Sequence, residues 1–252
     1  MGKKKQRRMS KSAAVYIPIG VLLTVLLVIV GTSGFLRVTD ITVDGATSYS
    51  DEEIIAISGI SIGDNLLFLD LGVAERRIQV AMPFINTANV SRIPPDSVRI
   101  EVTESNAIAA LEFRNTVILI DSTGRVLKHT ERAPAGLIEI WGLVPADAAE
   151  GSKLRAEQGG ELQLQYMIDV LAAIEREGIQ QNVSYLDVGN ISSLNFGYME
   201  RFRVMLGGPN NLRQKLSSLP GAIAGVEDKE PGGITGTLRS EPDGKWRWTP
   251  DN

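Results

Sequence analysis

The sequence contains no cysteine and only one histidine, His129. The lack of cysteine excludes disulfides and a lipoprotein anchor, so an exported form of this chain must be stabilised by packed cores. The single histidine excludes a histidine-rich metal site, and a catalytic triad would have to use His129. We interpret His129 as a surface residue of a hairpin.

Recognisable catalytic motifs are also lacking. No phosphate-binding loop, nucleophile elbow or zinc-binding helix occurs in the sequence. The segment LIDSTG is similar to the aspartic-protease pattern, but an extra residue separates Asp121 from Gly124, and Asp-Ser-Thr-Gly is ordinary turn chemistry. We therefore predict a protein that is not an enzyme and has no cofactor and no metal. An exported cell-wall enzyme stays open as an alternative, and it would require an active-site cluster.

Charge is missing from Ser12 to Leu36, and this gap follows a cluster of six cations: Lys3, Lys4, Lys5, Arg7, Arg8 and Lys11. Residues 13–36 would form a helix about 36 Å long, enough to cross a hydrocarbon core of about 30 Å with some tilt. Cations flanking a span stay on the cytoplasmic side. We predict a cytoplasmic tail (1–12), one transmembrane helix (13–36) and extracytoplasmic domains. The alternative is a cleaved signal peptide, whose apolar region is usually 7 to 15 residues long.

The part outside the membrane is acidic. Without the six tail cations, 20 basic residues face 30 acidic ones, a net charge of −10. This charge argues against nucleic-acid binding. The 216 residues from Arg37 onward are enough for two domains.

Residues 37–105 predict the order strand, helix, helix, strand, strand. Ser50 and Glu53 form a capping box for the first helix, and Gly59 suits its end. The second helix is expected from Asp70 to just before Pro83, with strands following at 87–91 and after the double proline. In RIPPDSVRIEVTE, the apolar residues Val98, Ile100 and Val102 should face the helices, and the alternating residues Arg99, Glu101 and Thr103 should face water.

The second half predicts a mostly antiparallel β domain with two amphipathic helices. Strands are expected in IAALEF, TVILIDSTGRVLKH, SYLDVG, ISSLNFG and RFRVMLGG. The first helix, 161–178, buries Leu164, Met167, Ile168, Leu171 and Ile174 and stops at Gly178. The second, PNNLRQKLSSLPG, is small, with Asn210 or Asn211 as its cap. A final hairpin joins ITGTLRS to KWRWTP through Pro242, Asp243 and Gly244.

Three stretches carry a family resemblance: RVTDITVDGATSYSDEEI, GDNLLFLD and MPFINTANVSRIPPDSVRIEVTES. Together with the basic tail and the span, they resemble the POTRA domain of the bacterial cell-division proteins FtsQ and DivIB. The resemblance continues in the helix at 161–178 and in LGGPNNLRQKL. It implies an α+β protein with a βααββ POTRA domain at 37–105 and an FtsQ/DivIB-type β domain at 106–252.

The resemblance also implies a function at the division septum. Such a protein is a single-pass scaffold of the divisome. It binds bitopic coiled-coil proteins of the FtsL and FtsB/DivIC kind and helps recruit and regulate the septal peptidoglycan synthase. The alternative is a POTRA-containing transport or assembly factor.

Partner-binding residues are implied at two places. In this family the last strands form a docking edge, which here gives Arg239, Trp246, Arg247 and Trp248. Trp246 and Trp248 share one face of their strand and Arg247 points the other way, so the tryptophans could instead simply cover the sheet. A second candidate site is the strand at Ala88, Asn89, Val90, Ser91 and Arg92, for which a plain structural role is the alternative.

Overall fold

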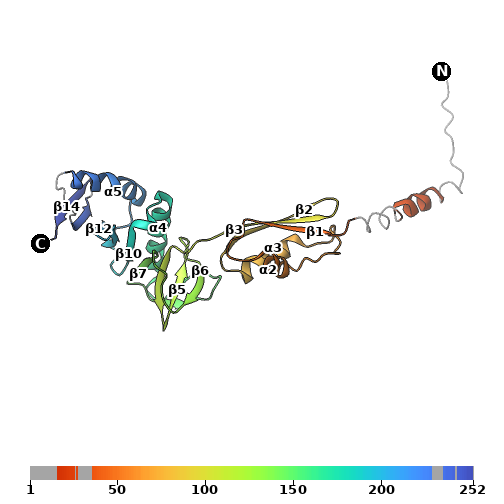
Figure 1. The fold of residues 1–252 in the computed structure, drawn as a ribbon, viewed down its shortest axis with the longest axis horizontal. Helices are drawn as coiled ribbons and strands as arrows, with labels where there is room; N and C mark the ends of the chain where they lie inside the picture. Colours follow the sequence, from red (N-terminus) through yellow and green to blue (C-terminus); the bar gives the residue numbers. More distant parts are fainter. Residues whose placement is uncertain (1–15, 26, 28–35, 229–234, 242, 252) are drawn as a thin grey trace, which may run out of the picture. The chain divides into compact units, whose positions relative to one another are not determined.

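The structure is a computed structural model that describes residues 16–25, 27, 36–228, 235–241 and 243–251 (Figure 1). Residues 16–25 are helical, and none of the helices in the described ranges is long and apolar enough to cross a bilayer. The six tail cations and half of the span expected at 13–36 lie outside these ranges, as does Pro242. The chain forms two compact units: Met1–Ile78 with Thr87–Glu104, and Gln79–Asn86 with Ser105–Asn252.

The first unit is built on a three-stranded sheet. In chain order its elements are β1 (Asp40–Asp44), α2 (Asp51–Ser58), most of α3 (Leu71–Ala81), most of β2 (Ile85–Ile93) and β3 (Ser97–Glu104). The strands lie in the order β1-β3-β2, and β1 runs parallel to β3. The predicted order of strands and helices is confirmed. β2 is longer than the strand expected at 87–91, because its pairing with β3 extends it beyond the apolar residues that mark it in the sequence.

Local signals set the helix ends of this unit as expected. The hydroxyl of Ser50 accepts from the amide of Glu53 at 3.3 Å, and the Glu53 carboxylate accepts from the amide of Ser50 at 2.9 Å. Gly59 ends α2 in the left-handed conformation, with φ 73°. Val98, Ile100 and Val102 are buried with residues of α2 and α3, whereas Arg99, Glu101 and Thr103 are exposed. The alternation predicted for this strand is therefore confirmed.

The second unit contains a nine-stranded sheet in the order β14-β13-β12-β11-β10-β7-β4-β5-β6. Its strands are β4 (Ala109–Phe113), β5 (Thr116–Ile120), β6 (Val126–Thr130), β7 (Ile138–Trp141), β10 (Val183–Asp187), β11 (Leu194–Tyr198), β12 (Phe202–Gly207), β13 (Gly236–Ser240) and β14 (Trp246–Pro250). Most neighbours are antiparallel, but β4–β7, β7–β10 and β12–β13 are parallel. A separate pair, β8 (Pro145–Asp147) and β9 (Arg155–Ala156), and the short 3₁₀ turn η1 (Gln180–Asn182) complete the unit with its helices.

Two helices, α4 (Glu161–Glu177) and α5 (Leu212–Glu227), pack on the same face of this sheet. The core between them and the sheet includes Leu171 and Ile174 of α4, Leu216 and Leu219 of α5, and Phe196 of β11. Every second residue of the central strands points into this core. The residues between them form the opposite face of the sheet, on which no described helix packs.

Several expectations for this unit need correction. α5 does not end at Pro220 but continues to Glu227, because Ile223 in the added turns is buried in the core. Asn211 stands at the N-cap position but is left-handed (φ 57°), and its side chain makes no capping hydrogen bond. Leu164 and Ile168 of α4 are only partly buried, and Val170 and Ala173 take their place in the core. The strands β7, β8 and β9 were not predicted.

Candidate functional site

The terminal hairpin lies at one end of the nine-stranded sheet. β13 and β14 pair antiparallel, with Leu238 opposite Trp248, Arg239 opposite Arg247 and Ser240 opposite Trp246. Because β14 ends the strand order, it has one hydrogen-bonding neighbour, β13, among the described strands. In the part of the chain that the structure describes, the other side of β14 is a free strand edge.

Two hydrogen bonds outside the named strands show which main-chain groups lie on this edge. The amide of Glu241 donates to the carbonyl of Lys245 at 2.9 Å, and the amide of Asp251 donates to the carbonyl of Thr235 at 3.2 Å. Bonded and non-bonded pairs alternate along an antiparallel ladder. The main-chain groups of Arg247 therefore bond to β13, whereas those of Trp246 and Trp248 point to the free edge. Pro250, the next residue in this outward series, has no N–H to offer.

The two tryptophan side chains face α5. The indole N–H of Trp246 donates to the hydroxyl of Ser218 at 2.9 Å, and both rings pack against the core. A Cβ on Gly236 would lie 2.7 Å from the indole nitrogen of Trp248, so this close packing requires a glycine. A hollow of about 660 Å³ lies between the tryptophans and α5. Both tryptophans therefore have a packing role, which is the alternative left open by the sequence.

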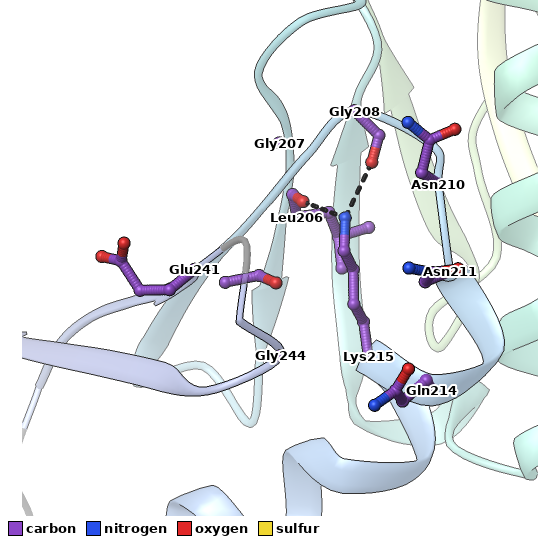
Figure 2. A pocket seen from close by; sticks show the side chains of 10 residues that line it. Leu206, Gly207, Gly208, Asn210, Asn211, Gln214, Lys215, Glu241 and Gly244 are labelled. Carbon is purple, nitrogen blue, oxygen red and sulfur yellow. Dashed lines mark hydrogen bonds between the residues drawn. The ribbon is translucent and has the colours of Figure 1, made fainter.

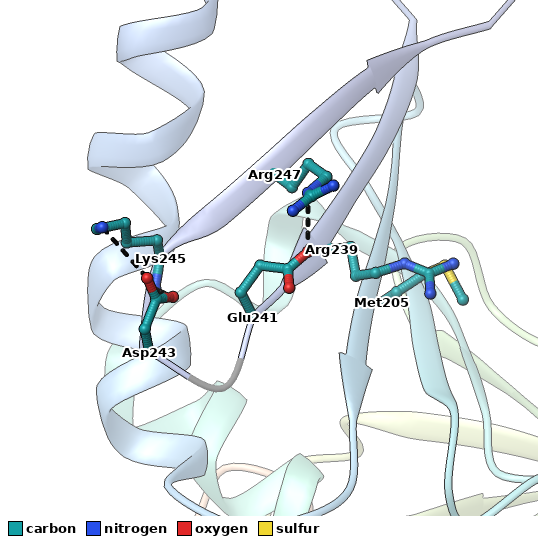
Figure 3. A network of polar contacts seen from close by, with 6 residues as sticks. All are labelled: Met205, Arg239, Glu241, Asp243, Lys245 and Arg247. Carbon is teal, nitrogen blue, oxygen red and sulfur yellow. Dashed lines mark hydrogen bonds and ion pairs between the residues drawn. The ribbon is translucent and has the colours of Figure 1, made fainter.

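Arg239 and Arg247 lie on the opposite face of the hairpin, as Figure 3 shows. The side chain of Arg247 is 70% exposed, and its Nε lies 2.9 Å from Oε1 of Glu241. The guanidinium of Arg239 lies 3.5 Å from the sulfur of Met205 (Figure 3). At the turn, Lys245 pairs with Asp243 at 3.2 Å, and its backbone N–H also lowers the pKa of the Asp243 carboxyl. The arginines are thus accessible cations held beside the free edge.

A second cavity, of about 440 Å³, lies between the hairpin turn and the start of α5 (Figure 2). The amine of Lys215 donates to the carbonyls of Leu206 at 2.7 Å and Gly208 at 2.9 Å. Burial lowers the pKa of Lys215. Because its amine is bound to two carbonyls, Lys215 holds the β12–α5 loop against the helix, which gives it a structural role.

The second predicted site lies on β2, an edge strand of the smaller sheet. Ala88 and Val90 are buried, and the carboxylate of Glu75 accepts from the amide of Val90 at 2.9 Å. Arg92 donates to the carbonyls of Leu66 and Leu69, both at 2.6 Å. Arg92 therefore fixes a loop within its own unit, and Glu75 covers part of this edge.

The residues considered for catalysis have structural partners. Asp121 is buried and accepts from the amides of Thr123 at 2.8 Å and Arg125 at 2.9 Å, as the turn interpretation predicts. His129 is half-buried rather than a free surface residue, since its Nε2 lies 2.6 Å from the carbonyl of Ala148. Within the described ranges, no three acidic or histidine side chains are grouped to hold a metal ion.

Comparison with known proteins matches residues 36–105 to the model of the POTRA domain, FtsQ-type. Relatives include the cell division protein FtsQ of Streptomyces griseus, 28% identical over 46% of this chain and 56% of the relative. FtsQ of Corynebacterium glutamicum is 27% identical over 65% of this chain and 67% of the relative. The cell division protein DivIB of Clostridium tetani is 22% identical over 78% of this chain and 73% of the relative.

These matches define a chain with an FtsQ-type POTRA domain. The chain is a relative of the cell division proteins FtsQ and DivIB, which confirms the resemblance found in the sequence. It spans between about half and three quarters of the length of these three relatives. Ser218 and Glu241, which bind side chains of the hairpin, were not predicted, because both contacts depend on the folded arrangement of α5 and the turn.

Proposed function

We propose that this chain is a non-enzymatic, membrane-anchored scaffold of the bacterial divisome that docks partner proteins on the free edge of β14. Its partners are FtsL-like and FtsB/DivIC-like bitopic proteins, and through them it helps recruit and regulate the septal peptidoglycan synthase. It sits at the septum with its N-terminus in the cytoplasm and its folded units outside. The relatives' role in cell division supports this proposal.

The observation that carries the proposal is the unpaired edge of β14. An extended partner segment can add to such an edge, with main-chain hydrogen bonds giving affinity and neighbouring side chains giving selectivity. The outward main-chain groups of Trp246 and Trp248 would supply those bonds. Arg239 and Arg247, beside the edge, would select a segment that carries acidic residues.

The tryptophans act indirectly in this mechanism. Because their rings pack against α5, they attach β14 to the helix that covers the sheet and keep the outer edge of β14 in position. Anchoring scaffold and partners in one membrane raises their effective concentration, so modest edge contacts are sufficient. The strand at 88–92 remains a proposed second contact, in which the exposed Asn89 is the residue best placed to reach a partner.

The test is binding of the full chain to an FtsL-like and FtsB/DivIC-like pair, with all three proteins in one nanodisc. We expect the double variant Arg239→Glu, Arg247→Glu to bind at least tenfold more weakly, because two accessible cations become anions. Partner binding should also slow hydrogen exchange at the main-chain amides of Trp246 and Trp248. The matched control is Arg176→Glu, an exposed arginine on α4.

The arginine variants suit this test better than Trp246→Ala or Trp248→Ala, which would disturb the packing on α5. Unchanged affinity in the double variant, together with unprotected amides at Trp246 and Trp248, would place the partner elsewhere. Equal loss in the Arg176→Glu control would show a general charge effect and would also contradict docking at β14.

A further inference from the structure

The helix-free face of the nine-stranded sheet exposes a fixed aromatic pair. Trp141 of β7 is 47% exposed, and its ring stacks on Tyr185 of β10 with 4.1 Å between ring centroids and 6° between planes. Gly197 of β11 leaves room for this pair, since a Cβ there would lie 2.6 Å from the ring of Tyr185. A large apolar ring held in a set position on an open face is a common feature of interaction surfaces.

The charged residues of this face are sorted by strand on the two sides of β11. On one side, the charged residues that face outward within β12, β13 and β14 are arginines: Arg203, Arg239 and Arg247. Asp251, directly after β14, lines the same region of this face as Arg203. On the other side, the outward residues of β10, β7 and β4 include carboxylates: Asp187, Glu139 and Glu112. β11 itself presents the uncharged Asn195 and Gly197.

The two series lie at matching distances from β11. β12 and β10 are one strand away from β11, β13 and β7 are two strands away, and β14 and β4 are three strands away. Adjacent strands are about 4.8 Å apart. Strand register places Asp187 opposite Asn195, Asn195 opposite Met205, and Met205 opposite Arg239. Arg247, Arg239 and Asp187 therefore lie in one row across the sheet, with the uncharged Met205 and Asn195 between them, and Arg203 and Glu139 lie in the neighbouring row.

We propose that this face binds the same face of a second copy of the chain, related by a two-fold axis that runs parallel to β11, midway between the β11 strands of the two copies. The rotation lays β10, β7 and β4 of one copy over β12, β13 and β14 of the other. The strands with carboxylates in each copy then face the strands with arginines in the other copy. This contact occurs twice in the dimer, as expected of an isologous interface. Trp141 comes over the strand that carries Arg239, a pairing that favours a guanidinium over the indole face.

Neighbouring groups limit the strength of this interface. Arg247 already pairs with Glu241, and Asp187 accepts from the amide of Gly189 at 2.9 Å. Lys128 lies on β6, outside the seven strands from β14 to β4 that face each other in the dimer, so it does not contribute to the interface. Seven strands of about five residues span roughly 450 Å² per copy, well below the roughly 800 Å² of a typical stable interface. The dimer is therefore weak and reversible, and salt weakens it further.

This inference shares Arg239 and Arg247 with the docking site proposed at β14, but it is tested with one protein alone, so its failure is distinguishable from failure of partner docking. Sedimentation equilibrium of the full chain in density-matched detergent micelles measures self-association. Glu139→Arg and Arg239→Glu should each weaken the dimer at least tenfold. Combining them should restore the dimer to within about threefold, because opposite charges again face each other across the axis.

Cross-linking provides a second readout, since the chain has no natural cysteine. With a bismaleimide cross-linker that spans the roughly 10 Å between packed sheets, Asn195→Cys on β11 should form covalently linked dimers. Ser217→Cys, exposed on α5, should not. A chain that stays monomeric, a dimer unaffected by either charge reversal, a double variant that does not recover, or equally fast cross-linking at position 217 would each overturn the proposal.

Discussion

Trp246 of β14 donates its indole N–H to the hydroxyl of Ser218 on α5 at 2.9 Å. This bond joins the last strand of the sheet to the helix that covers it. Ser218 also donates to the carbonyl of Lys215 at 3.0 Å, so its hydroxyl is both a hydrogen-bond donor and an acceptor. The position of the free β14 edge thus depends on a contact between residues far apart in the sequence.

Replacing Ser218 with alanine should destabilise the second unit. The change removes the acceptor of a half-buried indole N–H, and an unsatisfied buried donor costs about 1–3 kcal/mol. Ser217→Ala is the matched control, because Ser217 is an exposed serine of the same helix. We expect the control to change the free energy of unfolding by less than about 0.5 kcal/mol. Urea unfolding of the full chain, followed by circular dichroism, measures both, and equal effects would mean that the Trp246 bond contributes nothing.

Two glycines near the hairpin should respond in opposite directions to alanine. In Gly236→Ala the new Cβ would lie 2.5 Å from the carbonyl oxygen of Thr249, so the strand pair must shift, at a cost of about 1–3 kcal/mol. In Gly225→Ala, on α5, nothing lies within 4 Å, and the gain in helix propensity is about 0.5–1 kcal/mol. Thermal unfolding distinguishes them, and stabilisation by Gly236→Ala would contradict the packing described for β14.

Stability of the first unit should depend on Glu104 at acid pH. Desolvation raises the pKa of its carboxyl, but hydrogen bonds from Thr47 and Ser48 outweigh this and lower the pKa from 4.5 to about 2. The folded pKa lies below the unfolded one, so the stabilisation is fully present above about pH 4.5 and is lost as pH falls toward 2. Solvent exposure limits its size to the order of 1 kcal/mol.

The measurement is urea unfolding of the wild-type chain and Glu104→Gln between pH 2 and 7. The wild type should be more stable near neutral pH, and the difference should shrink toward zero at the acid end. Glu101→Gln, an exposed glutamate on the same strand, provides the control. A difference between wild type and Glu104→Gln that does not vary with pH would show that the four bonds from Thr47 and Ser48 do not hold the ionised carboxylate.

Features that depend on a few neighbouring residues were predictable from the sequence. The capping box at Ser50, the helix ends at Gly59 and Gly178, and the alternation around Ile100 all appear in the structure. α5 is the informative exception. Pro220 and Gly221 normally end a helix, but burial of Ile223 in the core outweighs their cost. The sheet residues that form this core lie in distant parts of the chain.

The candidate site was predictable only in part. The alternation of side chains along a strand predicted that Arg247 lies on the opposite face from the two tryptophans. The partner of Trp246 was not predictable, because it depends on where α5 packs. The charge order on the open face was out of reach, since Glu112 and Arg247 become related only through the strand order of the whole sheet. Arg92 was expected within the second candidate site, but its partners are the main-chain carbonyls of Leu66 and Leu69, a contact that depends on how their loop packs beside β2.

Glu75 should act as a cover for the edge of β2. Its carboxylate accepts from the amide of Val90, a main-chain donor that would otherwise be open to another strand. A hydrogen bond to a charged group contributes about 1.5–3 kcal/mol, and each 1.4 kcal/mol corresponds to tenfold in an equilibrium. Glu75→Ala should therefore speed hydrogen exchange at Val90 by roughly 10- to 100-fold, whereas Arg76→Ala, at the exposed neighbouring position, should leave it unchanged. If Val90 exchanges at the same rate in both variants, the edge is protected by something other than Glu75, and a partner strand at 88–92 would not have to displace this carboxylate.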